Sequence, residues 1–155
     1  MLQAYELHPD AFTSTVEERA PLPVAWWEKR LGDGTGAEAL VLGAFLRGEL
    51  AGVAGLSFEP RPKSRHKARL FGMYVPAAFR GKGIGRALVL AVLEQARRRD
   101  GVDLVQLSVT DGNLDARRLY ERCGFIVFGV EPRAMRDGDE YLAKVHMWCD
   151  LRETG

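Results

Sequence analysis

The sequence has few of the residues that mark secreted or metal-binding proteins. Its two cysteines, Cys123 and Cys149, are too few for the disulfide framework of a small secreted domain. Its three histidines, His8, His66 and His146, are scattered along the chain without the spacing of metal ligands. We therefore expect neither structural disulfides nor a metal site.

The chain also lacks an excess of one charge and any long apolar run. A formal net charge of +1 gives no general attraction to nucleic acid or to a membrane surface. The longest apolar run, near residues 87–93, is far too short to span a bilayer. The N-terminus, "MLQAYELHPD", has neither the basic region nor the apolar stretch of a signal peptide. These absences predict a cytoplasmic protein without nucleic-acid or membrane partners.

The 155 residues, 46% of them hydrophobic and 28% charged, suit one globular domain spanning residues 1–155. Hydrophobic periodicity and turn residues predict an α/β fold in which strands and helices are mixed. Helical crossovers between strands imply parallel neighbours in a mixed sheet. The predicted strands are residues 4–8, 38–47, 50–59, 68–75, 102–109, 124–130 and 141–151, and the predicted helices are residues 10–20, 23–31, 83–99 and 113–123. We read "GDGTG" (32–36) as a flexible turn.

Helical spacing predicts which side chains face the core. In the helix at residues 23–31, Val24, Trp27 and Leu31 share one stripe, and Trp26 lies off it. The helix at residues 83–99 is apolar almost all round, which is typical of a helix buried on more than one side. Its predicted main face comprises Ile84, Ala87, Leu88, Ala91, Val92 and Gln95.

That helix opens in an unusual stretch, "RGKGIGRAL" (80–88), in which glycines alternate with basic residues. Glycines ahead of a helix allow close backbone approach, and the helix start offers unpaired N–H groups and partial positive charge. Such a stretch suits an anion, most naturally a phosphate, although a glycine-rich turn with solvated charges is the alternative. The spacing matches neither G-x-G-x-x-G nor G-x-x-x-x-G-K-[ST], so both common nucleotide fingerprints are excluded.

Two segments, "MYVPAAFRGKGIGRAL" and "LSVTDGNLDARRLYERCGFIVFG", resemble the GNAT superfamily of acyl-CoA N-acyltransferases. The family signature [QR]-x-x-G-x-[GA] is matched by Arg80, Gly83 and Gly85, and the second segment by Asn113 and Tyr120. The resemblance covers nearly the whole chain. It implies a GNAT fold: a mixed, mostly antiparallel sheet of about six to seven strands with a splayed parallel pair, and about four helices.

The resemblance also implies acetyl-CoA as the acyl-donor cosubstrate. The loop from Arg80 to Gly85 would hold the pyrophosphate mainly through backbone N–H groups, and the backbone of residues 73–75 would bind pantetheine and the acyl oxygen. Lys82 and Arg86 either add charge to this site or remain solvated. The implied cofactor-binding residues are Met73, Tyr74, Val75, Arg80, Gly81, Lys82, Gly83, Ile84, Gly85, Arg86, Asn113 and Tyr120.

Acyl transfer to an amine needs a polarised carbonyl, a base for the amine and an acid for the thiolate. By resemblance Tyr120 is the candidate acid, with a half-buried core tyrosine as the alternative. Glu131 is the candidate to bind or deprotonate the amine, with a surface carboxylate as the alternative. The glutamate that some relatives carry before the signature is absent from "LFGMYV". Weaker candidates for the base are Asp139, Glu140 and His146.

These residues lead to one principal hypothesis: transfer of an acetyl group from acetyl-CoA to a primary amine of a small molecule or peptide, by direct attack in a ternary complex. By resemblance the acceptor cleft lies between the first helices and the last strands, where Trp26 is a candidate lining residue and a surface tryptophan is the alternative. A homodimer is a further expectation. Two alternatives stay open, a non-catalytic CoA-binding or sensing module and a protein N-terminal or lysine acetyltransferase.

Overall fold

The computed structural model describes residues 1–31 and 37–152, so the predicted turn at residues 32–36 lies outside the described part. The elements in chain order are α1 (Leu2–Leu7), η1 (Pro9–Ala11), α2 (Val16–Arg19), α3 (Val24–Leu31), β1 (Ala39–Leu46), β2 (Glu49–Phe58), β3 (Lys67–Tyr74), η2 (Ala77–Phe79), α4 (Ile84–Arg98), β4 (Leu104–Thr110), α5 (Leu114–Arg122), β5 (Ile126–Asp137) and β6 (Glu140–Asp150). In this part of the chain no helix is long and apolar enough to cross a membrane.

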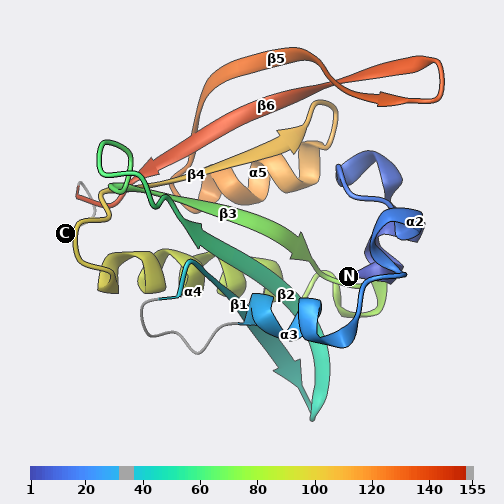
Figure 1. Ribbon diagram of the computed structural model, residues 1–155, viewed down its shortest axis with the longest axis horizontal. Helices are drawn as coiled ribbons and strands as arrows, with labels where there is room; N and C mark the ends of the chain where they lie inside the picture. Colours follow the sequence, from blue (N-terminus) through green and yellow to red (C-terminus); the bar gives the residue numbers. More distant parts are fainter. Residues whose placement is uncertain (32–36, 153–155) are drawn as a thin grey trace.

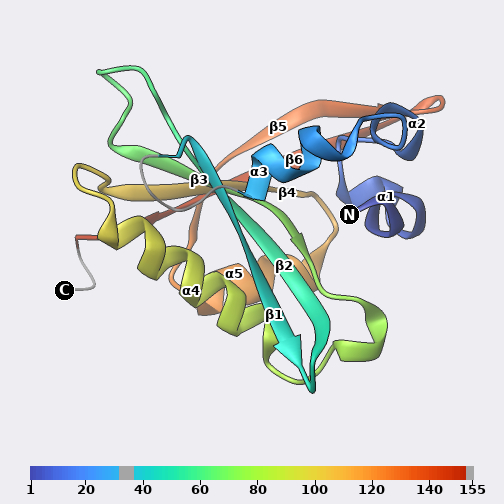
Figure 2. The same ribbon diagram turned by 60° about the horizontal axis from the view of Figure 1, so that its bottom comes forward.

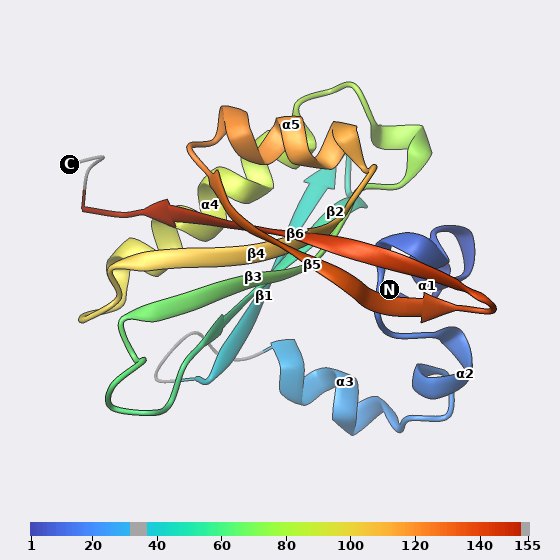
Figure 3. The same cartoon turned by 90° about the horizontal axis from the view of Figure 1, so that it is seen from above.

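The described strands form one six-stranded sheet in the order β1-β2-β3-β4-β6-β5. All neighbours are antiparallel except β3 and β4, which are parallel and joined through α4. Helices α4 and α5 cover one face of the sheet, and α1, α2 and α3 lie on the other side (Figures 2 and 3). The predicted mixed, mostly antiparallel α/β sheet is therefore confirmed.

The core lies between the sheet and the α4–α5 layer. Alternate residues of β4 and β6 point into it, because successive strand side chains face opposite sides of a sheet. The buried face of α4 differs from the predicted one, since Ala87 and Ala91 are exposed. Helix α4 packs mainly on one side, against the sheet, so its face follows the packing rather than the broad apolar pattern. Its buried residues are Leu88, Val89, Val92, Leu93 and Ala96.

The prediction of a strand at residues 4–8 is wrong, because the chain forms helix α1 there. Tyr5 N–H donates to Met1 O and His8 N–H donates to Ala4 O, which is helical bonding. Leu, Gln, Ala and Glu are good helix formers, and Pro9 ends the turn. Ala4 is fully buried, so tertiary packing stabilises a helix too short to persist alone.

Of the predicted helix at residues 10–20, only the single α-helical turn of α2, Val16–Arg19, is formed. Thr15 caps its start, since the Thr15 hydroxyl accepts from the Glu18 N–H at 3.2 Å.

Helix α3 has the predicted extent, but the stripe of side chains expected to face the core is not buried as predicted. Val24 and Leu31 are 70% and 57% exposed, because α3 lies at the sheet's rim rather than over its centre.

The strand predicted at residues 124–130 continues to Asp137 as the long edge strand β5. Its pairing with β6 shifts register twice, once between Val127 and Gly129 and once between Glu131 and Met135. Within the second irregularity Arg133 has a left-handed φ of 51°, which is uncommon outside glycine. The resulting β5–β6 hairpin arches toward α2 (Figure 1).

Candidate active site

The centre of the sheet is opened by the parallel pair. Strands β3 and β4 pair only from Lys67 to Arg69, against Leu104 to Gln106, and then diverge (Figure 1). Beyond that point β3 remains paired with β2 on its other side, as far as Tyr74. The edge of β3 that faces β4 therefore presents backbone groups without strand partners, as the predicted splayed pair requires.

A β-bulge lies on β3 just beyond the splay. Phe71 pairs with Gly55 and Tyr74 with Val53, so Gly72 and Met73 together oppose a single residue of β2. Gly72 has φ of +59°, a conformation that glycine adopts without steric penalty. Because a bulge bends its strand and re-aims the following groups, it turns the backbone of residues 73–75 at the mouth of the splay.

The glycine-rich loop leads directly from this strand into α4. Gly81 and Gly83 have φ of +76° and +77°, and Gly83 is the N-cap of α4 without a side-chain cap. Within the described residues, no backbone hydrogen bond is donated by the N–H groups of residues 81–86. A run of free N–H groups at the start of a 15-residue helix is an anion-binding concavity.

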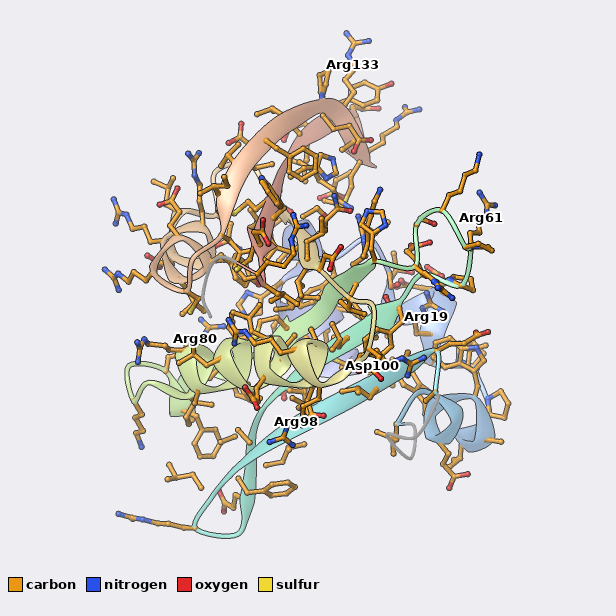
Figure 4. All side chains as sticks on the ribbon, turned by 90° about the vertical axis from the view of Figure 1, so that its left-hand side faces the viewer. Arg19, Arg61, Arg80, Arg98, Asp100 and Arg133 are labelled. Atoms are coloured by element: carbon orange, nitrogen blue, oxygen red, sulfur yellow. The ribbon has the colours of Figure 1, made fainter. Side chains whose placement is uncertain are left out.

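Arg80, the first residue of the signature, stabilises the loop itself. Its Nε donates to Val75 O at 2.9 Å, and its Nη2 lies 3.1 Å from His8 Nε2. The guanidinium thus joins the end of β3 to the N-terminal segment. In Figure 4, Arg80 at the start of α4 and Arg19 beside α3 lie on opposite sides of the sheet.

Gly85 brings the two sequence motifs together. A Cβ atom added there would lie 3.1 Å from Leu119 Cδ2 of α5 and 3.4 Å from Met73 Cε of β3. Contacts this close leave little room for a side chain, so the third glycine of the loop serves packing between α4, α5 and β3. The loop, residues 73–75 and α5 consequently meet at one place.

Helix α5 carries the second motif. Asn113 is its N-cap, and its Oδ1 accepts from the Ala116 N–H at 3.3 Å. Tyr120 is buried, with its ring edge-on to Phe125 at 5.9 Å. This burial raises the pKa of the Tyr120 phenol far above its usual value, with the nearby Cys123 thiol adding to the shift. The Tyr120 phenol therefore holds its proton more tightly than an exposed tyrosine does and remains a hydrogen-bond donor at physiological pH.

A cleft of about 400 Å³ lies on the opposite face of the sheet, between the N-terminal segment, α3 and the diverging strands. Gly72 and Ser108 line its floor from β3 and β4. Trp27, rather than the predicted Trp26, lines its wall. The Trp26 ring instead lies against Trp27 at 5.0 Å and beneath the guanidinium of Arg19 at 4.8 Å.

The charged side chains of the cleft are all basic. Arg19, Arg69 and Lys144 line it, and none of its described lining residues is acidic. Arg19 is held by Ser14 and Glu18, and Lys144 Nζ donates to the Thr13 hydroxyl at 2.6 Å. Arg69 is exposed, at the last position where β3 pairs with β4. The cleft therefore favours an anionic group over a cationic one.

The candidate base Glu131 forms a pair that the sequence pattern did not reveal. Its Oε2 lies 2.8 Å from Nε2 of His146, on the neighbouring strand β6. The weaker candidates Asp139 and Glu140 lie instead at the hairpin tip, where Asp139 pairs with Arg136 at 3.7 Å. Among the described residues no group of three or more His, Cys, Asp or Glu side chains could hold a metal ion.

Comparison with known proteins agrees with this geometry. The acetyltransferase (GNAT) family model matches residues 1–125. The chain is 29% identical over 140 residues to L-amino acid N-acetyltransferase AaaT of Escherichia coli K12, covering 90% of this chain and 83% of that protein. It is 27% identical over 131 residues to the L-methionine sulfoximine/L-methionine sulfone acetyltransferase of Pseudomonas aeruginosa, covering 84% and 73%.

Among solved structures, yncA of Salmonella typhimurium, determined with its cofactor acetyl-CoA, matches with a TM-score of 0.75 and 25% identity. The match covers 96% of this chain and 83% of that one. The family match spans well over half of the chain and includes the glycine-rich loop, α4 and α5. The chain therefore belongs to the GNAT family of acetyltransferases, enzymes that take their acetyl group from acetyl-CoA.

Proposed function

We propose that this protein transfers the acetyl group of acetyl-CoA to the primary amine of a small amino-acid-like molecule, by direct attack in a ternary complex. The observation that carries this proposal is the position of Gly72. It forms the bulge that precedes residues 73–75, where the β3 edge facing β4 has no strand partner, and it also lines the basic cleft. An acceptor in the cleft would therefore lie next to the backbone groups that polarise the acyl carbonyl.

The residues present fit acetyl-CoA on the other side of the sheet. The free N–H groups of residues 81–86 would hold its pyrophosphate, with Lys82 and Arg86 adding charge. Arg80 would act by shaping this loop, because two of its nitrogens are already engaged. Asn113 uses its oxygen as a helix cap, which leaves its amide N–H group for the cofactor. When bound, the cofactor supplies an activated thioester carbonyl.

Tyr120 is the proposed acid for the departing thiolate. Its buried position keeps the phenol protonated, and α5 packs against Gly85 at the start of α4. A neutral donor near a developing thiolate stabilises that charge by hydrogen bonding, and the raised pKa delays proton transfer until the C–S bond breaks. No covalent acyl-enzyme is part of the proposal, because the attacking nitrogen comes from the acceptor itself.

The charge of the cleft supports an acceptor with a carboxylate. A free α-amino acid would place its carboxylate against Arg69, whose guanidinium suits bidentate recognition of such a group. Trp27, Leu31 and Val41 give the cleft an apolar wall for the acceptor's side chain. Two of the matched relatives carry names that state activity on amino acids or an amino-acid analogue. A lysine-rich peptide would be repelled by the same basic residues.

The acceptor class can be tested by thiol release from acetyl-CoA. We expect kcat/KM for L-leucine or L-methionine to exceed that for the matching amine without a carboxylate by about 10- to 100-fold, because a charged hydrogen bond contributes about 1.5–3 kcal/mol. Arg69→Gln should remove most of this preference. Arg61→Gln, in the exposed loop before β3, is the matched control and should preserve it.

Other outcomes of this experiment would overturn the proposal. A preference for cationic peptides over amino acids would assign the protein to the peptide or lysine acetyltransferases instead. Stabilisation of the fold by acetyl-CoA, without thiol release on any amine, would indicate a non-catalytic CoA-binding module. Absence of any stabilisation by acetyl-CoA would show that the proposed use of residues 81–86 is wrong.

A further inference from the structure

We infer that His146 accepts the proton of the acceptor amine and that Glu131 is a positioning residue that orients its imidazole. The inference rests on the proposed function and names the base for the same reaction. It departs from the simpler expectation that Glu131 acts directly. The reasons are the register of three adjacent strands, the hydrogen bond between the two side chains, and the distribution of charge around them.

The sheet places His146 beside the cleft. Its strand β6 lies between β4 and β5, and His146 is directly opposite Ser108 of β4, a cleft-lining residue. The flanking Val145 and Met147 are buried in the core, so His146 points to the opposite, cleft-side face. Ser108 therefore lies between the cleft and the imidazole.

Glu131 reaches the same face from the edge strand. It pairs with Lys144, and Gly129 pairs with His146, so residues 129 and 131 share the face of those two β6 residues. Gly129, directly opposite His146, has no side chain of its own, so the β5 side chains that reach the imidazole are those of Phe128 and Glu131. The Glu131 side chain is 52% exposed and that of His146 only 24%. The carboxylate is thus on the solvent side, and the imidazole is on the cleft side.

The 2.8 Å contact determines which nitrogen of His146 is available. At neutral pH the Glu131 carboxylate only accepts, so Nε2 of His146 must donate its hydrogen to Oε2. In the neutral imidazole Nδ1 then carries the lone pair. A carboxylate behind a histidine holds the ring orientation and stabilises the imidazolium that forms when Nδ1 takes a proton. The pair is therefore arranged as a base with its orienting group.

The charged groups facing His146 come from three strands. Glu131 contacts it from β5, Lys144 lies two residues away on β6 with its Nζ at Thr13, and Arg69 lines the cleft from β3. The β4 residues on that face, Gln106, Ser108 and Thr110, are not ionisable in this pH range. Phe128 covers the ring from β5 at 6.0 Å. Glu131 is the only described carboxylate hydrogen-bonded to this imidazole.

The acetyl transfer forms one bond, breaks one bond and moves two protons. The lone pair of the neutral amine forms a C–N bond to the thioester carbonyl carbon, and collapse of the adduct breaks the C–S bond. The proton lost by the attacking nitrogen passes to Nδ1 of His146, directly or through the Ser108 hydroxyl, and then to solvent. The thiolate receives a proton from Tyr120, which solvent replaces. The products are the amide and free CoA.

Substitutions at the pair test the inference through the pH profile of kcat/KM. We expect His146→Gln to lower kcat by about 10²- to 10⁴-fold, the usual contribution of a general base, and to remove the acidic limb of the profile. Glu131→Gln should lower kcat by about 10-fold but retain that limb, because the imidazole that accepts the proton is still present. Neither substitution should change the Kd of acetyl-CoA. Asp137→Asn, which changes an exposed carboxylate near the tip of the same hairpin, is the control and should match the wild type.

Each alternative result has a distinct meaning. An unchanged kcat and pH profile in both His146→Gln and His146→Asn would overturn the role of His146. Loss of the acidic limb in Glu131→Gln alone would make Glu131 itself the base. If the wild type binds acetyl-CoA but acetylates no amine, the proposed function fails, and this inference fails with it. If the His146 variants acetylate the acceptor as fast as the wild type does, the role of His146 is wrong but the proposed function stands.

Discussion

Gly83 combines two requirements in one residue. Its φ of +77° lies in the region that disfavours side chains, and it is the N-cap from which the free N–H groups of α4 begin. No atom lies within 4 Å of the place where a Cβ would be, so the constraint comes from backbone conformation rather than from crowding. A substitution at Gly83 should therefore have two effects that can be measured separately, one on the stability of the fold and one on ligand binding.

We expect Gly83→Ala to lower the free energy of unfolding by about 1–2 kcal/mol, the cost of a left-handed alanine, and to weaken acetyl-CoA binding as well. Gly48→Ala is the matched control, since Gly48 has φ of +81°, open space around it, and a place in the β1–β2 turn. Urea unfolding and calorimetric titration measure both quantities. Equal acetyl-CoA affinity in the two variants would contradict the binding role of the loop.

At the scale of the element, α5 shows how a short helix is defined by its first residue. Asn113 satisfies an otherwise unpaired N–H group, and the left-handed Gly124, with φ of +97°, follows the helix end. Both features depend on neighbours within a few residues of the helix ends, so they are encoded locally in the sequence. The strand predicted at residues 4–8 was wrong for the opposite reason, because helix α1 depends on the tertiary packing that buries Ala4.

Two substitutions at the cap separate its structural role from its proposed cofactor contact. Asn113→Ala should cost about 1 kcal/mol of stability, whereas Asn113→Asp retains a capping oxygen and should cost little. Both remove the side-chain N–H group, so both should weaken acetyl-CoA binding. Thermal unfolding and titration with acetyl-CoA distinguish the effects. If Asn113→Asp binds acetyl-CoA as tightly as the wild type, the Asn113 side chain acts only as a helix cap and does not contact the cofactor.

For the whole molecule, burial of Tyr120 links stability to alkaline pH. The raised pKa keeps the phenol neutral in the folded state, while in the unfolded chain it ionises near its ordinary value of about 10. Above that pH the unfolded state binds fewer protons than the folded state, so the free energy of unfolding falls as pH rises. Below the unfolded pKa this contribution to stability is fully present.

We expect stability to fall above about pH 10 by about 1.4 kcal/mol per pH unit from this residue alone. Tyr120→Phe should remove that part of the slope, while other titrating groups act equally in both proteins. Urea unfolding at several alkaline pH values measures the difference. Identical slopes for the wild type and the variant would show that the phenol is not shielded from solvent in the folded state.

The sequence determined by itself those features that depend on residues close together in the chain. They include strands β1 to β4 and β6, helices α3 to α5, the glycine-rich start of α4 and the cap at Asn113. Each follows from periodicity, turn residues or backbone freedom over a few positions. The family resemblance extended this local information to a sheet with a splayed parallel pair, and the pairing of β3 with β4 agrees.

Only the tertiary structure decided what meets across the sheet. Register brings Ser108, His146 and the edge-strand Glu131 onto one face, although up to 38 positions separate them in the chain. Packing likewise placed Trp27 rather than Trp26 in the cleft and selected the buried face of α4. The physical reason is that a side chain's partner across a strand depends on pairing register and bulges. No local periodicity contains that information.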